Sequence, residues 1–439
     1  MKRTRHPLVL ITALLVLLGA GWAAAGPALA GTRTAPLRPI IFVHGFSGSG
    51  MQFETQAKRF ASNGYPARYV ATVEYDSLLL NTNAVYAAID QRVAQLKAAT
   101  GARKVDLAGH SLGTVLCMNY LNSSAARAAN VAHYVNIDGG TATALPGGVP
   151  TLALWGEGND TKAVTGALNL HAPNESHVQT TTSVHTFTAM YQFFTGHRPR
   201  TTRVVPQVGR IQLAGRAVNF PSNSGIQNAR LDVYTVNPAT GARTRARPVA
   251  TFQFGAGGDG TFGPFPGSGT AWYEFAITKG NQVHHLYFEP FRRTDLGIRL
   301  LTTDPGTGID TLWERNAAHV NLLVYRNKEW WGDQGAANDK LTVNGTNILN
   351  ASITPRAKRA IGILAFDAKS DKVSHPTMVP SPLISLVPFV TGVDLYIPSS
   401  GRVVLNTVQR AGNGRPDRVV VPAWPSDRNI VTVNLNDYV

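Results

Sequence analysis

Residues 105–114 have the sequence Val-Asp-Leu-Ala-Gly-His-Ser-Leu-Gly-Thr, in which an apolar run passes into a helical pattern through the motif Gly-x-Ser-x-Gly. The motif alone is weak evidence for a nucleophilic serine, because three fixed residues recur by chance in a chain with 42 glycines. Here it lies directly after a predicted strand, 104–108, and directly before a predicted helix, 112–121. A nucleophilic serine on a sharp strand-to-helix turn has this context. The stretch therefore indicates a sheet with crossover helices and makes Ser111 the candidate nucleophile.

The alternation of short β-branched runs with helical patterns extends from residue 38 to residue 197. The other predicted strands are 39–43, 69–73, 133–137, 151–155 and a weaker one at 167–170. The other predicted helices are 52–61, 83–99 and 184–194. Such alternation is typical of a parallel sheet with helices on its faces. We therefore predict one doubly wound α/β domain over residues 31–197.

The second half of the chain has a different pattern. Residues 198–205 are a predicted linker, after which no long helical periodicity returns. Short alternating runs bounded by Asn, Pro and Gly, such as 229–236, are typical of strands joined by turns. Residues 206–439 are therefore predicted to be an all-β sandwich or barrel, with a division into two lobes near residue 280 as one option.

The first thirty residues have the pattern of an export signal. Lys2, Arg3 and Arg5 precede an almost wholly apolar run at 8–25, and the small residues of 28–30 offer a cleavage site. We expect residues 1–30 to be a signal peptide cleaved near Ala30, so that the mature protein is secreted. An uncleaved N-terminal anchor is the alternative.

Charge and cysteine content limit the function classes. Residues 31–197 hold 11 Lys and Arg against 9 Asp and Glu, whereas residues 198–439 hold 27 against 17, so most of the net charge of +15 lies in the predicted β region. This excess favours contact with anionic surfaces such as lipid head groups, although compositional drift would also produce it. No nucleic-acid-binding motif accompanies it. The single cysteine, Cys117, excludes an intramolecular disulfide, and no carboxylate cluster resembles a calcium loop. No metal, cofactor or protein partner is implied.

A serine nucleophile needs a base, and in this architecture the chain order is serine, acid, histidine. His177 lies in a turn-rich stretch between the last predicted strand and the last helix, which makes it the favoured base. His185, in the first turn of that helix, is next. His171 and His197 are the other histidines considered as the base.

The acid has two candidates. Asp138 and Asp160 each follow a predicted strand downstream of Ser111, and either one permits the order serine, acid, histidine. The residues alone do not choose between them.

Two further features belong to the predicted site. The stretch His44-Gly45-Phe46 opens a loop after the first strand, and the backbone N–H groups of Phe46 and Leu112 are the predicted oxyanion hole. The three successive leucines at 78–80, Leu78, Leu79 and Leu80, suit either a core segment or a mobile lid over an acyl pocket.

Several stretches together resemble the archaeal-type lipases exemplified by the Archaeoglobus lipase. They are His44-Gly45-Phe46 with residues 52–56, Gly109-His110-Ser111-Leu112-Gly113, residues 122–124, 131–139, 180–187, 343–347 and 421–424, and the terminal Asp437-Tyr438. The resemblance implies an α/β-hydrolase fold with a minimal cap, followed by a C-terminal β domain that helps to bind long-chain substrates. It also implies the triad Ser111, Asp138 and His177, which leaves Asp160 as the alternative acid.

The expected function is that of a secreted serine carboxylic-ester hydrolase, a triacylglycerol lipase or esterase that works through an acyl-enzyme. Its substrate would be a lipid or another hydrophobic ester. A polyester depolymerase with the same chemistry is the alternative. A third hypothesis, from another class, is a surface-binding protein with an inactive hydrolase lobe, against which the complete set of catalytic residue types argues.

Overall fold

The structure is a computed structural model in which residues 37–381, 384, 388–410, 414 and 416–438 are described. The predicted signal peptide, residues 1–30, lies outside these residues. No helix in the described part of the chain is long and apolar enough to cross a membrane.

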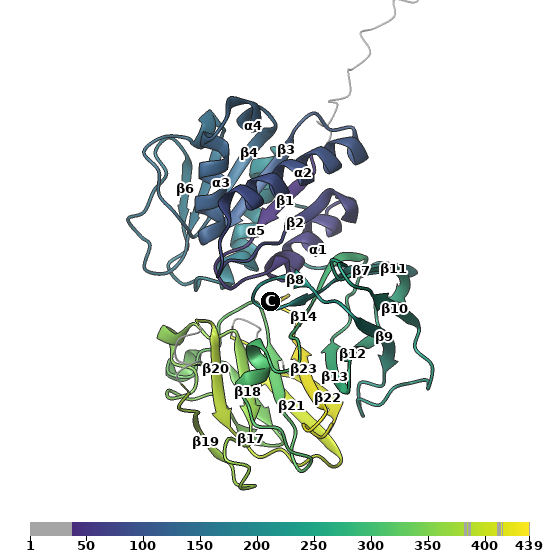
Figure 1. The fold of residues 1–439 in the computed structure, drawn as a ribbon. Coiled ribbons are helices and arrows are strands. Elements are labelled where there is room, and N and C mark those ends of the chain that lie inside the picture. Colours follow the sequence, from purple (N-terminus) through teal and green to yellow (C-terminus); the bar gives the residue numbers. More distant parts are fainter. Residues whose placement is uncertain (1–36, 382–383, 385–387, 411–413, 415, 439) are drawn as a thin grey trace, which may run out of the picture. The chain divides into compact units, whose positions relative to one another are not determined.

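The first part of the described chain is a six-stranded sheet with the order β2-β1-β3-β4-β5-β6 (Figure 1). Its strands are β1 (Ile40–Val43), β2 (Val70–Val73), β3 (Val105–His110), β4 (Val131–Ile137), β5 (Thr151–Trp155) and β6 (Leu168–His171). All five pairings are parallel. The carboxyl ends of the strands therefore share one edge of the sheet, and the loops that follow β1, β3, β4 and β5 meet there.

Helices cover both faces of this sheet. They are α1 (Glu54–Ser62), α2 (Thr82–Thr100), α3 (Leu112–Asn122), α4 (Ala125–Ala129) and α5 (Val184–Thr195). Successive residues of a strand point to opposite faces. Accordingly, Phe42 packs in one cluster with Phe60 of α1 and Phe187 of α5, whereas the next residue, Val43, packs with Ile89 of α2. The α/β fold class predicted from the sequence is confirmed.

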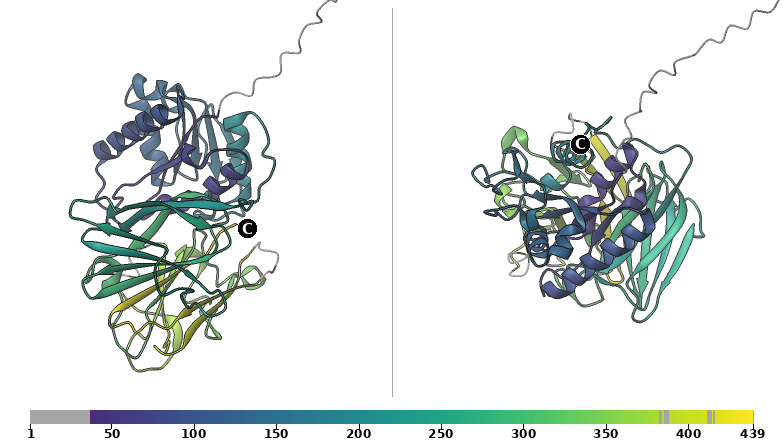
Figure 2. Two further views of the ribbon diagram at one scale, coloured as in Figure 1. Left: turned by 90° about the vertical axis from the view of Figure 1, so that its right-hand side faces the viewer. Right: turned by 90° about the horizontal axis from the view of Figure 1, so that it is seen from above.

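The rest of the described chain is built almost entirely from strands (Figures 1 and 2). A nine-stranded sheet has the order β10-β9-β12-β13-β23-β15-β18-β20-β19, and two four-stranded sheets contain β11, β7, β14 and β8, and β17, β16, β21 and β22. The strands up to β14 are β7 (Arg210–Asn219), β8 (Ser224–Gly225), β9 (Ala229–Val236), β10 (Ala250–Phe254), β11 (Thr261–Ser268), β12 (Trp272–Lys279), β13 (Gln282–Phe288) and β14 (Asp295–Thr302). The later strands are β15 (Leu322–Tyr325), β16 (Lys340–Val343), β17 (Thr346–Asn347), β18 (Gly362–Phe366), β19 (His375–Met378), β20 (Val390–Asp394), β21 (Arg402–Val408), β22 (Pro416–Pro422) and β23 (Asn429–Asn434).

Short 3-10 helices occur in several of the loops. They are η1 (Gly50–Phe53), η2 (Ala67–Tyr69), η3 (Pro146–Gly148), η4 (Gln179–Thr181), η5 (Gly308–Thr311), η6 (Gly335–Ala337) and η7 (Arg356–Lys358).

The division expected near residue 280 falls in the turn between β12 and β13. These strands pair antiparallel from Tyr273↔Phe288 to Lys279↔Gln282, and β13 pairs in parallel with β23, close to the end of the chain. A boundary at 280 would cut a hairpin inside the nine-stranded sheet. The chain therefore does not divide there.

Candidate active site

Ser111 occupies the turn between β3 and α3. Its backbone has φ 54° and ψ −120°, a left-handed conformation that is rare for a residue other than glycine. The turn leaves no room for side chains on its glycines. A Cβ on Gly109 would lie 2.5 Å from the carbonyl oxygen of Gly113, and a Cβ on Gly113 would collide with the carbonyl oxygen of Val43. The spacing Gly-x-Ser-x-Gly is therefore a steric requirement of this turn.

Hydrogen bonds hold the strained turn in place. The Ser111 N–H donates to the carbonyl oxygen of Ile137 at 3.0 Å. The Ser111 carbonyl accepts from the Thr114 N–H at 3.0 Å and from Thr114 Oγ1 at 2.7 Å. Strain of this kind costs about 1–3 kcal/mol and persists only where the surroundings impose it.

Asp138 follows β4 and lies beside His177. Its Oδ2 accepts a hydrogen bond from His177 Nδ1 at 2.6 Å. Its Oδ1 accepts from the Gly156 N–H and from the Asn159 side-chain amide, both at 2.7 Å. Burial alone would raise the pKa of the Asp138 carboxyl, but the hydrogen bond from His177 and those from the 156–159 loop lower it. The carboxylate is therefore ionised and holds the His177 proton on Nδ1, which leaves Nε2 of the neutral ring as an acceptor.

His110, next to the serine, supports His177 from the other side. The two rings lie 4.6 Å apart, and His110 Nε2 donates to the His177 carbonyl oxygen at 3.0 Å. Burial and the neighbouring His177 lower the pKa of His110 to about 3, so this ring is neutral. Thr180 Oγ1 donates to the same carbonyl at 2.7 Å.

The backbone N–H groups of Phe46 and Leu112, both near Ser111, have no hydrogen-bond acceptor within the described residues. Leu112 is the first residue of α3. The loop that carries Phe46 lies against the serine, because a Cβ added to Gly45 would come within 2.9 Å of the Ser111 Cβ. Both unpaired donors therefore belong to segments that adjoin Ser111.

A cavity of about 10 Å³ joins these groups. It is lined by Phe46, Ser47, Gln52, His110, Ser111, His177, Val178, Ile361 and Phe389. Two of its walls, Ile361 and Phe389, come from the β-rich part of the chain. The site is therefore completed by residues far from the Gly-x-Ser-x-Gly motif in sequence.

Comparison with known families concerns the domain organisation of the chain. Residues 37–133 match the family model of class 2 lipases, residues 209–305 match the lipase C-terminal domain, and residues 308–439 match a further C-terminal-domain family. A lipase domain followed by C-terminal domains is the organisation of the Archaeoglobus-like lipases. The three matches together support the Archaeoglobus-like lipase family for this chain. The chain is accordingly a hydrolase of the lipase and esterase type. No curated protein sequence matches it.

Similar solved structures include three α/β proteins, all of low identity. The product of a Listeria innocua gene has 13% identity and a TM-score of 0.29 over 38% of this chain and 97% of that chain. A CIB-like hydrolase of Thermoplasma acidophilum has 14% identity and a TM-score of 0.28 over 39% and 90%. The Bacillus licheniformis lipase BlEst2 in its propeptide form has 12% identity and a TM-score of 0.30 over 88% and 93%. At these values the similarities say nothing about the substrate.

The histidine loop, which is the loop of residues 176–179 that carries His177, is held by a carboxylate from the C-terminal region. Glu329, which is fully buried, lies in the loop after β15. One carboxylate oxygen accepts from the Val178 N–H at 2.6 Å, and the other accepts from Ser176 Oγ at 2.5 Å and from the Gln179 N–H at 3.1 Å. These donors flank His177 on both sides. The position of the histidine therefore depends on a residue some 150 positions away.

Arg410 extends this support. Its Nη2 donates to Ser176 Oγ and to the Gln179 side-chain oxygen, both at 3.0 Å, and its Nη1 donates to Asp339 at 2.8 Å. Burial would raise the pKa of Asp339, but Arg326 and Arg410 hold it well below its usual range. A buried network of Arg326, Asp339 and Arg410 in the C-terminal region thus stabilises the loop that carries His177.

The alternative acid, Asp160, does not lie beside His177. It is exposed, and the loop that carries it presents Asn159 to the Asp138 carboxylate instead. The other candidate bases, His171, His185 and His197, are also exposed. The geometry therefore brings together Ser111, Asp138 and His177, and leaves out the alternatives.

The three leucines at 78–80 are exposed rather than packed in the core. Their side chains are 51%, 80% and 41% exposed for Leu78, Leu79 and Leu80. Asp76 Oδ1 accepts from the backbone N–H groups of Leu78 and Leu79, and Ser77 Oγ accepts from the Ser47 N–H at 2.8 Å. The leucine segment is therefore tied to the loop that carries Phe46.

Sequence reasoning missed the supporting residues of this site. Glu329, Arg410 and Phe389 stand in irregular stretches of the β-rich region, and no periodicity or motif marks them. Asn159 had a weak signal, because it belongs to the Gly- and Asn-rich run after β5 that also contains Asp160.

Proposed function

We propose that this chain is a secreted serine carboxylic-ester hydrolase that acts on lipid esters through an acyl-enzyme. The observation that carries the proposal is the 2.6 Å hydrogen bond from His177 Nδ1 to an ionised Asp138, in a pocket shared with the strained Ser111. A hydroxyl becomes a good nucleophile only next to a correctly oriented base.

In the first step Ser111 Oγ attacks the ester carbonyl carbon while His177 Nε2 takes the hydroxyl proton. The oxyanion that forms accepts hydrogen bonds from the N–H groups of Phe46 and Leu112, which have no other partner within the described residues. The imidazolium then gives its proton to the leaving alcohol as the carbon–oxygen bond breaks. Asp138 stabilises the imidazolium and keeps the ring in position.

In the second step a water molecule attacks the carbonyl carbon of the acyl group that is bound to Ser111 Oγ, and it gives a proton to His177 Nε2. The proton returns to Ser111 Oγ as the acyl–oxygen bond breaks, and a fatty acid leaves. No redox partner or metal is needed for either step.

The surroundings of the site support a lipid ester as substrate. The pocket at Ser111 is only about 10 Å³, too small for an acyl chain, so substrate entry requires a movement of its walls. A separate small apolar cavity lies in the β-rich part of the chain, and its lining includes Gly362 and Val390, the sequence neighbours of Ile361 and Phe389. The exposed leucines 78–80 are hydrogen-bonded through Ser77 to the loop that carries Phe46, and they suit a lid that opens at an apolar surface.

Export and contact with lipid head groups are part of the same proposal. The basic start and apolar run of residues 1–30 support export, and the excess of cations in residues 198–439 supports attraction to an anionic interface. N-terminal sequencing of the protein from culture medium should find a chain that begins near Gly31. An N-terminus at Met1 would contradict cleavage.

The activity is tested by a hydrolysis profile of the purified protein. p-Nitrophenyl esters from short to long acyl chains, an emulsified triglyceride and a polyester film are compared for the wild type, Ser111→Ala and the control Ser123→Ala at the other end of α3. We expect the wild type and Ser123→Ala to prefer lipid esters and Ser111→Ala to be inactive. Preference for the polyester would change the substrate class, and full activity of Ser111→Ala would refute the mechanism.

A further inference from the structure

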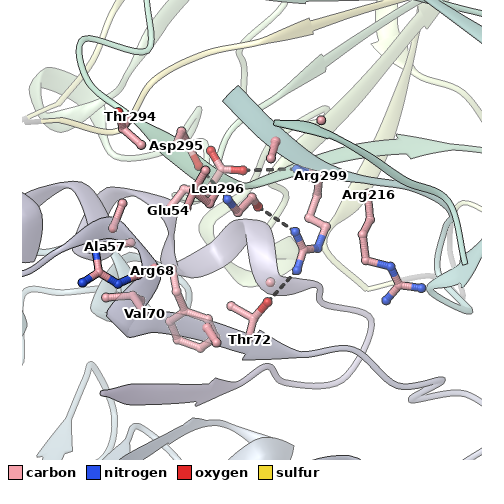
Figure 3. Close-up of a pocket in the computed structure, with 18 of the residues that line it drawn as sticks. Glu54, Ala57, Arg68, Val70, Thr72, Arg216, Thr294, Asp295, Leu296 and Arg299 are labelled. Atoms are coloured by element: carbon pink, nitrogen blue, oxygen red, sulfur yellow. Dashed lines mark hydrogen bonds between the residues drawn. The ribbon is translucent and has the colours of Figure 1, made fainter. Parts of the chain in front are cut away.

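A second cavity, of about 360 Å³, shares no lining residue with the pocket at Ser111. It lies among α1, β2, β7 and β14, and part of its wall is apolar (Figure 3). The apolar lining includes Phe53, Ala57, Val70, Leu96, Phe262 and Leu296. Leu296 is 39% exposed, which keeps part of the apolar wall accessible.

A polar cavity of about 430 Å³ adjoins the first, because Arg92, Arg216 and Thr261 line both. Its other polar walls are Gln91 and Gln95 of α2 and the carboxyl groups of Glu74 and Asp259. The two cavities are therefore neighbours, one largely apolar and one polar, with the guanidinium groups of Arg92 and Arg216 at their shared boundary.

Most other charges of this region are already compensated. Lys58 pairs with Asp295 at 2.8 Å, and Arg299 pairs with Glu74 at 2.5 Å. Burial and the neighbouring Asp295 raise the pKa of Glu54 to about 8, so this carboxyl is neutral at pH 7. None of these groups forms an ion pair with Arg92 or Arg216, so the positive charges of these two arginines are not fully neutralised.

Arg92 and Arg216 are compensated only in part, by the nearby carboxylates of Glu74 and Asp259, and neither arginine forms an ion pair with them. Arg92 has no hydrogen bond or ion pair to any of the described residues. Arg216 donates to the backbone carbonyl of Asp259 at 2.7 and 2.9 Å, and in Figure 3 its side chain extends apart from Arg299, which points to Thr72. Burial and the positive charges of Arg299 and Arg216 lower the pKa of Arg92, as expected for a cation that faces other cations.

We propose that these neighbouring cavities bind a single-chain amphiphile with an anionic head group, the head between Arg92 and Arg216 and the chain along the apolar walls. Guanidinium groups bind carboxylates and phosphates through paired, charge-assisted hydrogen bonds. The head is therefore the carboxylate of a fatty acid or the phosphate of a lipid-derived monoester. The proposal goes beyond the hydrolytic function and does not depend on it.

Calorimetric titration of the full-length Ser111→Ala protein tests the proposal without turnover. The ligands are decanoate and decyl phosphate below their critical micelle concentrations, decanol below its solubility limit, and acetate. We expect at least one of the two anionic amphiphiles to bind, and decanol and acetate to bind at least about tenfold more weakly. Lengthening the bound anion by two methylenes should raise the affinity about tenfold.

Variants separate this site from the pocket at Ser111. Arg92→Ala and Arg216→Ala should each weaken binding about tenfold, whereas Arg210→Ala, an exposed arginine at the start of the same strand β7, should not. Leu296→Asp should weaken binding through the chain and leaves both arginines in place. Circular dichroism and the melting temperature verify folding, and in an otherwise wild-type chain these variants should keep the wild-type rate on a short soluble ester.

The outcomes decide between the sources of the head group and the proposal as a whole. Binding of decanoate alone assigns a fatty acid, and binding of decyl phosphate alone assigns a phosphate monoester. Equal affinity for decanol and decanoate, or unchanged affinity in both arginine variants, overturns the proposal. An inactive wild-type enzyme would refute the hydrolytic function but would leave these binding results fully interpretable.

Discussion

Replacing Glu329 should lower the activity by misplacing the proposed base, His177, although His177 itself is unchanged. In Glu329→Ala, the Val178 and Gln179 N–H groups lose the carboxylate that accepts their hydrogen bonds at 2.6 and 3.1 Å. A buried N–H left without an acceptor costs about 1–3 kcal/mol, so the loop gains by moving towards other acceptors. A relaxation of about 2 kcal/mol lowers the fraction of molecules with His177 in place about 30-fold.

The measurement is kcat and KM on a short soluble ester, together with circular dichroism and the melting temperature. We expect Glu329→Ala to lower kcat by about 10- to 100-fold with little change in KM, because the site still forms but the base is misplaced. Glu329→Gln keeps one acceptor oxygen and should lose less.

The matched control is Glu289→Gln. Glu289 is a half-buried carboxyl of the C-terminal region, and it accepts from the Asn436 N–H at 2.6 Å rather than from the loop that carries His177. Burial raises the pKa of Glu289 to about 7, so the neutral amide is a mild replacement near that pH. A folded Glu329→Ala protein with the kcat of the wild type would refute the positioning role.

Three further predictions test the acid, the buried network and the pocket wall. Asp138→Asn should lower kcat about 10⁴-fold, because an amide can hold the wrong tautomer of the base, whereas Asp160→Asn should leave kcat unchanged; the reverse ranking would move the acid. Asp339→Asn should lower the free energy of unfolding at pH 7 by about 3–5 kcal/mol, because it leaves Arg326 buried without its partner. The pKa of Asp339 is lower in the folded than in the unfolded state, so its contribution is complete above about pH 5 and is lost as the pH falls below about 4. Urea denaturation at pH 7 and below about pH 4 should therefore show that the difference in free energy of unfolding between Asp339→Asn and the wild type is smaller in acid. Phe389→Ala should raise kcat/KM on long acyl esters relative to short ones, and an unchanged ratio would show that this ring does not limit the pocket.

Local sequence determined the turn at Ser111. Strand, turn and helix follow one another within residues 105–122, and the glycines at 109 and 113 are required by contacts within a few residues or with the adjacent strand β1. The alternation of strands and helices up to residue 197 likewise depends on short-range periodicity. Such features are predictable because the interactions that cause them are local or repeat at a fixed period.

The choice of acid and the support of the base depended on tertiary structure. Asp138 and Asp160 both follow strands, and only the path of the 156–160 loop turns the Asn159 amide, rather than the Asp160 carboxylate, towards the site. Glu329 reaches the histidine loop because the nine-stranded sheet pairs β13 and β15 with β23 in parallel, across long sequence separations. No local pattern records such pairings, since their register is decided by the burial of whole sheet faces. The sequence by itself therefore determined which serine is presented on the turn, and the tertiary structure decided which carboxylates hold and orient its histidine.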